Sequence, residues 1–252
     1  MNVDVYLNSL PEDTEEINVS EKGISYLDVT RFKKLKKLRC DFNNLTSLHL
    51  NESLQELHCN GNQLTSLHLN ENLQTLHCSY NRLTSLHLNE NLITLFCCSN
   101  QLTSLHLNEK LQALRCSGNL FTSLHLNKNL NSLFCSNNQL TSLRLNEALE
   151  SLDCRHNQLI TLYLENPIKI LYYNNNPICD ITNGNNTHII NQKLKILNGF
   201  RFLYYCLRLK KRFRDWLWIK IREPKIREKY SHDYLVANLH EDTDLDELLE
   251  NW

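Results

Sequence analysis

Hydrophobic residues return along this chain at a fixed period of 19 residues. Residues 57–70 read LHCNGNQLTSLHLN, and residues 76–89 read LHCSYNRLTSLHLN, with the same apolar positions. A fixed period of about 20 residues is typical of a solenoid, in which each turn stacks on the next. The leucine that sets the phase recurs eight times, as Leu38, Leu57, Leu76, Leu95, Leu114, Leu133, Leu152 and Leu171.

Each turn contains two stretches in which apolar and polar residues alternate. Leu57 and Cys59 form one pair and Leu67 and Leu69 the other, ten residues apart. Alternation of this kind predicts a short strand with both apolar side chains turned inward. A turn therefore has two extended pieces joined by two corners, and 19 residues leave no room for a helix on the far side.

Asparagine occupies both corners of the repeat. Asn side chains tolerate tight corners and hydrogen-bond backbone groups there, so a stacked column of them can satisfy the amides of a neighbouring turn. We predict such a structural role for the corner that follows the Leu-x-Cys strand. Its members include Asn62, Asn81, Asn100, Asn119, Asn138 and Asn157, and the second corner carries Asn51, Asn70, Asn89, Asn108, Asn127 and Asn146.

The repeat Leu-x-x-Leu-x-Cys-x-x-Asn-x-Leu resembles a leucine-rich repeat with Cys at the third inward position. Its second half, Leu-Thr-Ser-Leu-His-Leu-Asn, resembles the short bacterial and viral variety. The resemblance implies a leucine-rich repeat solenoid with a parallel sheet on the concave face, a second extended side and a protein-binding role.

The ends of the array break the pattern in different ways. Residues 1–37 read as a leader and a degenerate turn, two residues longer than the rest, whose lysines give a polar edge suited to an N-terminal cap. The array of eight turns spans 38–181. Residues 182–252 predict a helical C-terminal cap, with a basic aromatic helix from Phe200 to Arg222 and an acidic tail.

The C-terminal segment leaves two interpretations open. Residues 193–229 hold 13 Lys and Arg against 3 Asp and Glu, whereas residues 230–252 hold 7 acids and no Lys or Arg. An acidic tail folded over the basic helix would complete a cap. The alternative is a surface for anionic membranes or nucleic acid. The whole chain has a net charge of −1, which shows no bias toward nucleic acid.

Seven of the ten cysteines occupy one inward position at the repeat period. These are Cys40, Cys59, Cys78, Cys97, Cys116, Cys135 and Cys154, with Tyr173 in the eighth copy. The pattern favours a column of small buried residues in a reducing compartment over a redox or metal site. Alternation turns Cys98 outward, so it should be the most exposed thiol of the array.

The outward position between Leu and Cys varies from turn to turn and predicts a binding surface. Exposed aromatic residues and arginines in one patch are typical of interface centres; random drift at solvent positions is the alternative. The candidate concave-face residues are His58, His77, Phe96, Arg115, Phe134, Asp153, Arg155 and Tyr172.

The second extended segment carries a histidine at the same place in five turns: His49, His68, His87, His106 and His125. We expect their rings to stack about 5 Å apart. Rings in register do not converge on a tetrahedral point, so copying of one repeat explains the column better than metal binding does.

No catalytic motif is recognisable. The chain has no phosphate loop, nucleophile elbow or His-Glu-x-x-His. We therefore predict a non-enzymatic module without a cofactor, small-molecule substrate or transmembrane segment, which binds a host or viral protein. A ubiquitin-ligase substrate adaptor is a further alternative.

The two ends of the chain carry a second resemblance. The opening turn, 17–27, and the segments 218–231 and 244–252 resemble those of uncharacterised leucine-rich repeat proteins of giant DNA viruses of amoebae. This resemblance implies an intracellular viral protein in the host cytoplasm. No secretory signal is visible at the N-terminus, which agrees with that location.

Overall fold

The computed structural model describes residues 3–163, 168–179, 192–193 and 196. The chain divides into two units, residues 1–198 and 199–252. The second unit lies outside the described residues, and so do the predicted basic helix and acidic tail. Among the residues that are described, no helix is long and apolar enough to cross a membrane.

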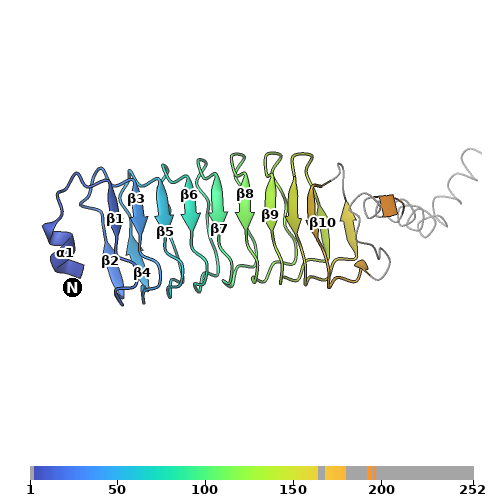
Figure 1. Ribbon diagram of the computed structural model, residues 1–252, viewed down its shortest axis with the longest axis horizontal. Helices are drawn as coiled ribbons and strands as arrows, with labels where there is room; N and C mark the ends of the chain where they lie inside the picture. Colours follow the sequence, from blue (N-terminus) through green and yellow to red (C-terminus); the bar gives the residue numbers. More distant parts are fainter. Residues whose placement is uncertain (1–2, 164–167, 180–191, 194–195, 197–252) are drawn as a thin grey trace, which may run out of the picture. The chain divides into compact units, whose positions relative to one another are not determined.

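The main sheet is parallel and has nine strands, one from each successive turn (Figure 1). Leu38 pairs with Leu57, and this register repeats up to Leu152 and Leu171. The predicted solenoid of eight turns after a capping turn is confirmed. Its strands are β1 (Glu16–Asn18), β3 (Lys37–Arg39), β5 (Glu56–His58), β6 (Thr75–His77), β7 (Thr94–Phe96), β8 (Ala113–Arg115), β9 (Ser132–Phe134), β11 (Ser151–Asp153) and β13 (Ile170–Tyr172).

The second extended side forms paired strands only near the two ends of the array. β2 (Tyr26–Asp28) pairs with β4 (Ser47–His49), and β10 (Ser142–Arg144) pairs with β12 (Thr161–Tyr163). In the turns between them, the Leu-His-Leu segments are not assigned to strands. The prediction of two extended pieces per turn thus holds for the sheet side throughout and for the far side in part.

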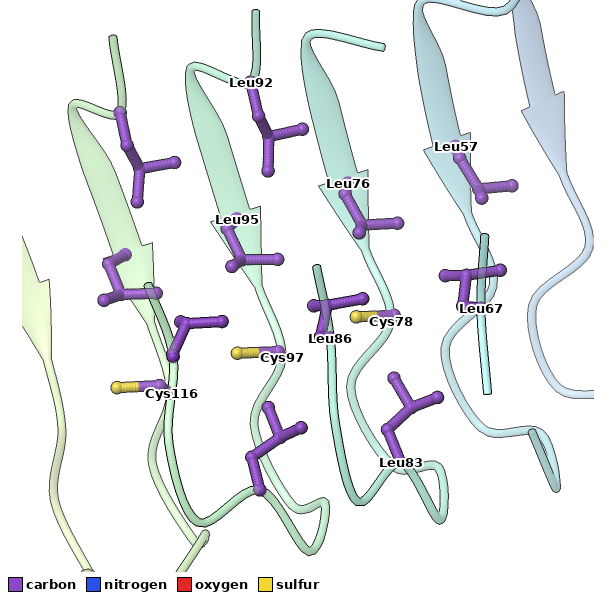
Figure 2. Packing of buried hydrophobic residues seen from close by; sticks show 14 of the residues in the cluster. Leu57, Leu67, Leu76, Cys78, Leu83, Leu86, Leu92, Leu95, Cys97 and Cys116 are labelled. Atoms are coloured by element: carbon purple, nitrogen blue, oxygen red, sulfur yellow. The ribbon is translucent and has the colours of Figure 1, made fainter. Parts of the chain in front are cut away.

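The core lies between the two sides and repeats in each turn. From Leu38 to Cys154, the leucines and cysteines that the period places inward on the sheet side are buried, Leu76 and Cys78 among them. Figure 2 shows the side chains of Cys78, Cys97 and Cys116 in parallel, one behind another. Tyr173, which replaces Cys in the last turn, is also buried. Sharing the core between turns is what lets a short turn remain folded.

The corner asparagines after the sheet strands link neighbouring turns. The Asn100 carboxamide oxygen accepts a hydrogen bond from the Leu83 amide at 3.0 Å. Its Nδ2 donates to the carbonyls of Cys78 at 3.0 Å and Cys97 at 3.2 Å. The same pattern recurs at Asn62, Asn81, Asn119, Asn138 and Asn157, all of them buried.

The left-handed backbone of this corner belongs to the residue before the asparagine. Tyr80, Ser99 and Asn137 have φ between 51° and 57° there. Glycine takes this place at Gly61, where an added Cβ would lie 2.6 Å from the Phe42 ring. The asparagine itself therefore acts through its side chain and not through a tolerance of the left-handed region.

The N-terminal leader is structured, which the sequence did not predict. It forms α1 (Val3–Ser9), and Val3 and Leu7 are buried in the same core as the repeats. Lys34 and Lys36, predicted to form a polar edge, pair with Asp13 at 3.8 Å and Glu15 at 3.0 Å. The helix and these pairs cover the N-terminal end of the solenoid, whose exposed edge would otherwise invite association.

Candidate functional site

All residues of the predicted binding surface except Arg155 lie in one row across the main sheet. Each is the last residue of its strand, and the parallel register sets it directly opposite the next one. We call this set the sheet-face row. It consists of Arg39, His58, His77, Phe96, Arg115, Phe134, Asp153 and Tyr172.

Five consecutive members of the sheet-face row form a continuous stack. The ring centroids of His58 and His77 are 4.2 Å apart, and those of His77 and Phe96 are 4.3 Å apart with planes inclined by only 15°. The Arg115 guanidinium carbon lies 4.5 Å from the Phe96 centroid and 5.0 Å from that of Phe134. These separations are close to the spacing of neighbouring strands, so the sheet itself holds the groups in contact.

Arg115 stands out in this stack because its charge is not neutralised. The side chain is exposed, and within the described residues it forms no salt bridge. The two rings hold its guanidinium by cation–π contacts, which fix the group without using its N–H donors.

Asp153 and Tyr172 meet a third residue, Arg155. Both guanidinium-to-carboxylate contacts are short, with Arg155 Nε to Asp153 Oδ1 at 2.9 Å and Nη2 to Oδ2 at 2.7 Å. The guanidinium carbon also lies 5.2 Å from the Tyr172 ring centroid. Asp153 was predicted to face solvent but is only 5% exposed. The prediction was wrong because alternation sets the direction of a side chain and says nothing of what covers it.

Glu56 and Lys37 form an ion pair beside His58 that the sequence did not single out. Glu56 Oε1 lies 3.1 Å from Lys37 Nζ and 2.6 Å from His58 Nε2. Burial alone would raise the pKa of the Glu56 carboxyl, but the hydrogen bonds and charges of Lys37 and His58 outweigh it and lower that pKa. The charges of Lys37 and Glu56 are therefore paired beside His58.

His77 lies in the middle of the stack and favours its neutral form. Burial is the main reason that its pKa falls from 6.5 to about 4, and the positive charge that His58 can carry adds to the effect. At neutral pH the ring is therefore uncharged. It extends the apolar part of the row formed by Phe96.

A second column on the sheet face, two residues further along each turn, is tied together by hydrogen bonds. Asp41 Oδ1 accepts from the Asn60 amide at 2.8 Å, Asn60 Oδ1 from the Ser79 amide at 2.9 Å, and Ser79 Oγ from the Cys98 amide at 3.0 Å. Ser79 and Ser136 of this column are buried. In the sequence, the signal for these hydrogen bonds was the recurrence at this position of side chains with an acceptor oxygen.

The histidine column on the far side differs from the sheet-face row. All five histidines are exposed. The ring contact recorded for the column joins His49 to Tyr26 at 5.6 Å, while His68, His87, His106 and His125 make no recorded ring contact in the described part of the chain. The predicted stacking is therefore wrong. The reason is that the far-side segments of these turns do not pair as strands, so no sheet sets their spacing.

Open hollows lie between successive far-side segments. One of them, about 540 Å³, lies between residues 104–109 and 123–127 and is lined by His106 and His125. Across the described ranges, no three His, Cys, Asp or Glu side chains are placed to hold a metal ion.

The thiols fall into two classes. Burial raises the pKa of the seven column cysteines above the ordinary value. Cys98, on the sheet face, and Cys179 are partly exposed. No described cysteine is in a disulfide.

Known structures share this architecture. YopM from Yersinia enterocolitica aligns with a TM-score of 0.64 and 30% identity over 67% of this chain and 39% of that one. YopM from Yersinia pestis, a leucine-rich effector protein, gives 0.60 and 28% over 64% and 49%. InlJ from Listeria monocytogenes, whose functional domain includes a cysteine ladder, gives 0.61 and 28% over 73% and 48%. The fold is the leucine-rich repeat solenoid.

This leucine-rich repeat chain spans less than half the length of each of these three proteins. Neither a family of known proteins nor a curated protein matches it in sequence. The likeness therefore concerns the repeat array.

Proposed function

We propose that the protein is a non-enzymatic recognition module that binds another protein through its sheet face. The observation that carries the proposal is the continuous stack from His58 to Phe134, which crosses five turns. Aromatic residues and arginine are the residues that contribute most at protein interfaces. Structural neighbours that share the leucine-rich repeat solenoid, such as YopM, support a role in protein interaction.

The stack is also ordered before any partner arrives. His77, Phe96 and Arg115 are held by neighbours on both sides, and His58 and Phe134 by one neighbour each, so few rotamers are lost on binding. Since immobilising a flexible side chain costs about 0.5–1.5 kcal/mol, a pre-ordered row of five groups favours affinity.

We further propose that the protein works in a reducing compartment. Nine described cysteines are free thiols, and seven of them stand in one column inside the core. If the resemblance of the chain ends to giant-virus repeat proteins reflects its source, that compartment is the cytoplasm of an amoeba, and its partner is to be sought there.

Affinity capture with face-specific variants tests the sheet-face proposal. The sheet-face variant replaces Phe96, Arg115 and Phe134 with Ser, Gln and Ser. A matched far-side variant replaces with Ser the residues His87, His106 and His125, which lie in the far-side segments that precede β7, β8 and β9. We expect proteins from amoebal lysate that bind wild type and the far-side variant but not the sheet-face variant. Partners retained by the sheet-face variant and lost by the far-side variant would contradict the proposal.

A further inference from the structure

We propose that Arg115 is the anchor for a carboxylate side chain of the partner, so that the protein recognises an acidic residue flanked by apolar ones in an extended protein segment. This inference rests on the proposed binding through the sheet face and adds the chemistry of the partner. Its starting point is the one unpaired cation inside the stack.

The geometry leaves the N–H groups of Arg115 available. The planar group is covered on one side by the Phe96 ring at 4.5 Å and on the other by the Phe134 ring at 5.0 Å. Stacked rings cover the two faces of a guanidinium. They leave its edge free, where all five N–H donors point. An edge with parallel N–H donors matches a carboxylate, which it can hold by two hydrogen bonds.

The rings add to this preference. In an aromatic ring the face is negative and the edge positive. Phe96 has one face toward His77 and the other toward Arg115, so the part of this ring that remains for a partner is its edge. The Arg115 donors and the ring edges beside them therefore form a positive rim in an apolar surrounding, where a single anion flanked by apolar groups fits.

Two of the other three cations on the sheet face are already paired. The Lys37 ammonium lies 3.1 Å from Glu56, and the Arg155 guanidinium lies 2.7 Å from Asp153. From β3 to β13 the sheet face holds four cations (Lys37, Arg39, Arg115 and Arg155) against three anions (Asp41, Glu56 and Asp153).

This balance argues against a nucleic acid as the occupant. A polyanion needs many cations along its path, and the face has a net charge near +1. Unpaired bases need free aromatic faces on which to stack. Those of His77 and Phe96 are already covered by neighbours in the row. A protein segment with a lone carboxylate meets neither difficulty.

A random peptide library displayed on phage gives the test, since it does not presuppose the partner. Twelve-residue peptides selected on the wild-type full chain should be enriched in Asp or Glu beside apolar residues. A synthetic peptide from that selection is then titrated by fluorescence anisotropy against Arg115→Gln, Arg115→Lys and a matched control, Arg82→Gln. Arg82 is an exposed arginine at a corner of the repeat, outside the sheet-face row.

We expect Arg115→Gln to weaken binding at least tenfold, Arg115→Lys to weaken it less, and Arg82→Gln to change it less than twofold. Charge reversal sharpens the test. Arg115→Glu should lose the acidic peptide and bind instead a copy in which the acidic residue is replaced by Lys. Thermal unfolding of each variant shows whether the fold is kept. If Arg115→Gln does not fold, the peptide titration of Arg115→Lys takes its place.

The other outcomes separate this inference from the proposed function. Peptides that depend on Phe96 and Phe134 but show no acidic enrichment and bind Arg115→Gln normally would overturn the carboxylate anchor and leave sheet-face binding in place. Peptides insensitive to every sheet-face substitution would overturn both. Tighter, salt-sensitive binding of a 20-nucleotide oligouridine through Arg115 would overturn the protein partner in favour of single-stranded RNA.

Discussion

The sheet-face row and the far-side histidine column are built from the same repeat and have the same period, yet they have different properties. From His58 to Phe134, successive residues of the sheet-face row lie 4.2–5.0 Å apart, because hydrogen-bonded strands hold their backbones in register. His68, His87 and His106 have no such support and make no recorded ring contact. The comparison teaches that a period in sequence becomes a surface of interacting groups only where backbone pairing sets the spacing.

The two corner asparagine columns offer the largest test of this comparison. Asn100, which follows a sheet strand, forms hydrogen bonds with backbone groups of the neighbouring turn and of its own turn. Asn70, which follows a far-side segment, donates one hydrogen bond to the Asn51 carbonyl, and its buried Oδ1 has no partner among the described residues. We expect Asn100→Ala to lower the free energy of unfolding by about 3–5 kcal/mol and Asn70→Ala by about 1 kcal/mol. Urea unfolding followed by circular dichroism measures both.

An exposed residue provides the control for this pair. Asn131→Ala should change the free energy of unfolding by less than about 0.5 kcal/mol, since its side chain is exposed and makes no recorded hydrogen bond. Equal losses for Asn100→Ala and Asn70→Ala would mean that the number of hydrogen bonds a corner asparagine forms does not set its contribution.

The stack itself gives the next largest effect. Phe96→Ala removes the contacts to both His77 and Arg115. Ring pairs contribute about 0.5–1.5 kcal/mol each beyond area burial, so we expect a loss of about 1–3 kcal/mol. The matched far-side change, His106→Ala, should cost less than about 0.5 kcal/mol. A far-side loss as large as that of Phe96→Ala would show that the histidines also interact.

Acid should weaken the sheet side more than the far side. His77 has a pKa of about 4 in the folded state, below its ordinary 6.5, so the unfolded chain binds the proton first as the pH falls. Its contribution is complete above pH 6.5 and is lost as the pH falls toward 4. Because the ring is partly exposed, we expect a loss of about 1–2 kcal/mol between pH 7 and pH 4.5.

His77→Phe keeps a ring in the stack but removes the titration. Its free energy of unfolding should therefore fall less between pH 7 and pH 4.5 than that of wild type, by the same 1–2 kcal/mol. His87→Phe, the matched far-side change, should follow wild type. A variant that loses as much stability as wild type over this range would show that His77 does not carry the acid sensitivity.

Periodicity alone predicted much of the fold. The positions of Leu38, Leu57 and Cys59 determine where the sheet strands lie, and the buried Asn62 column follows from the need to satisfy corner amides. What the period missed depends on individual side chains and on a segment outside the repeats. The burial of Asp153 needs Arg155 above it, and α1 belongs to a leader that has no repeat.

For the site, the sequence named the residues of the sheet-face row but not their interactions. Alternation places Phe96, Arg115 and Phe134 on one face. That Arg115 is held between the two rings depends on side-chain rotamers and on the registered strands below. The prediction for the far side failed for the converse reason. A histidine at the same place in each turn was expected to stack, but no backbone pairing sets the spacing of these residues.

The most direct test of the central claim is hydrogen–deuterium exchange of the protein alone and in complex with a protein captured by wild type. We predict slower exchange on binding in β7, β8 and β9 and in the residues that follow each strand, with no change in 86–88, 105–107 and 124–126, the far-side segments that precede these strands. Protection confined to these far-side segments would contradict the account.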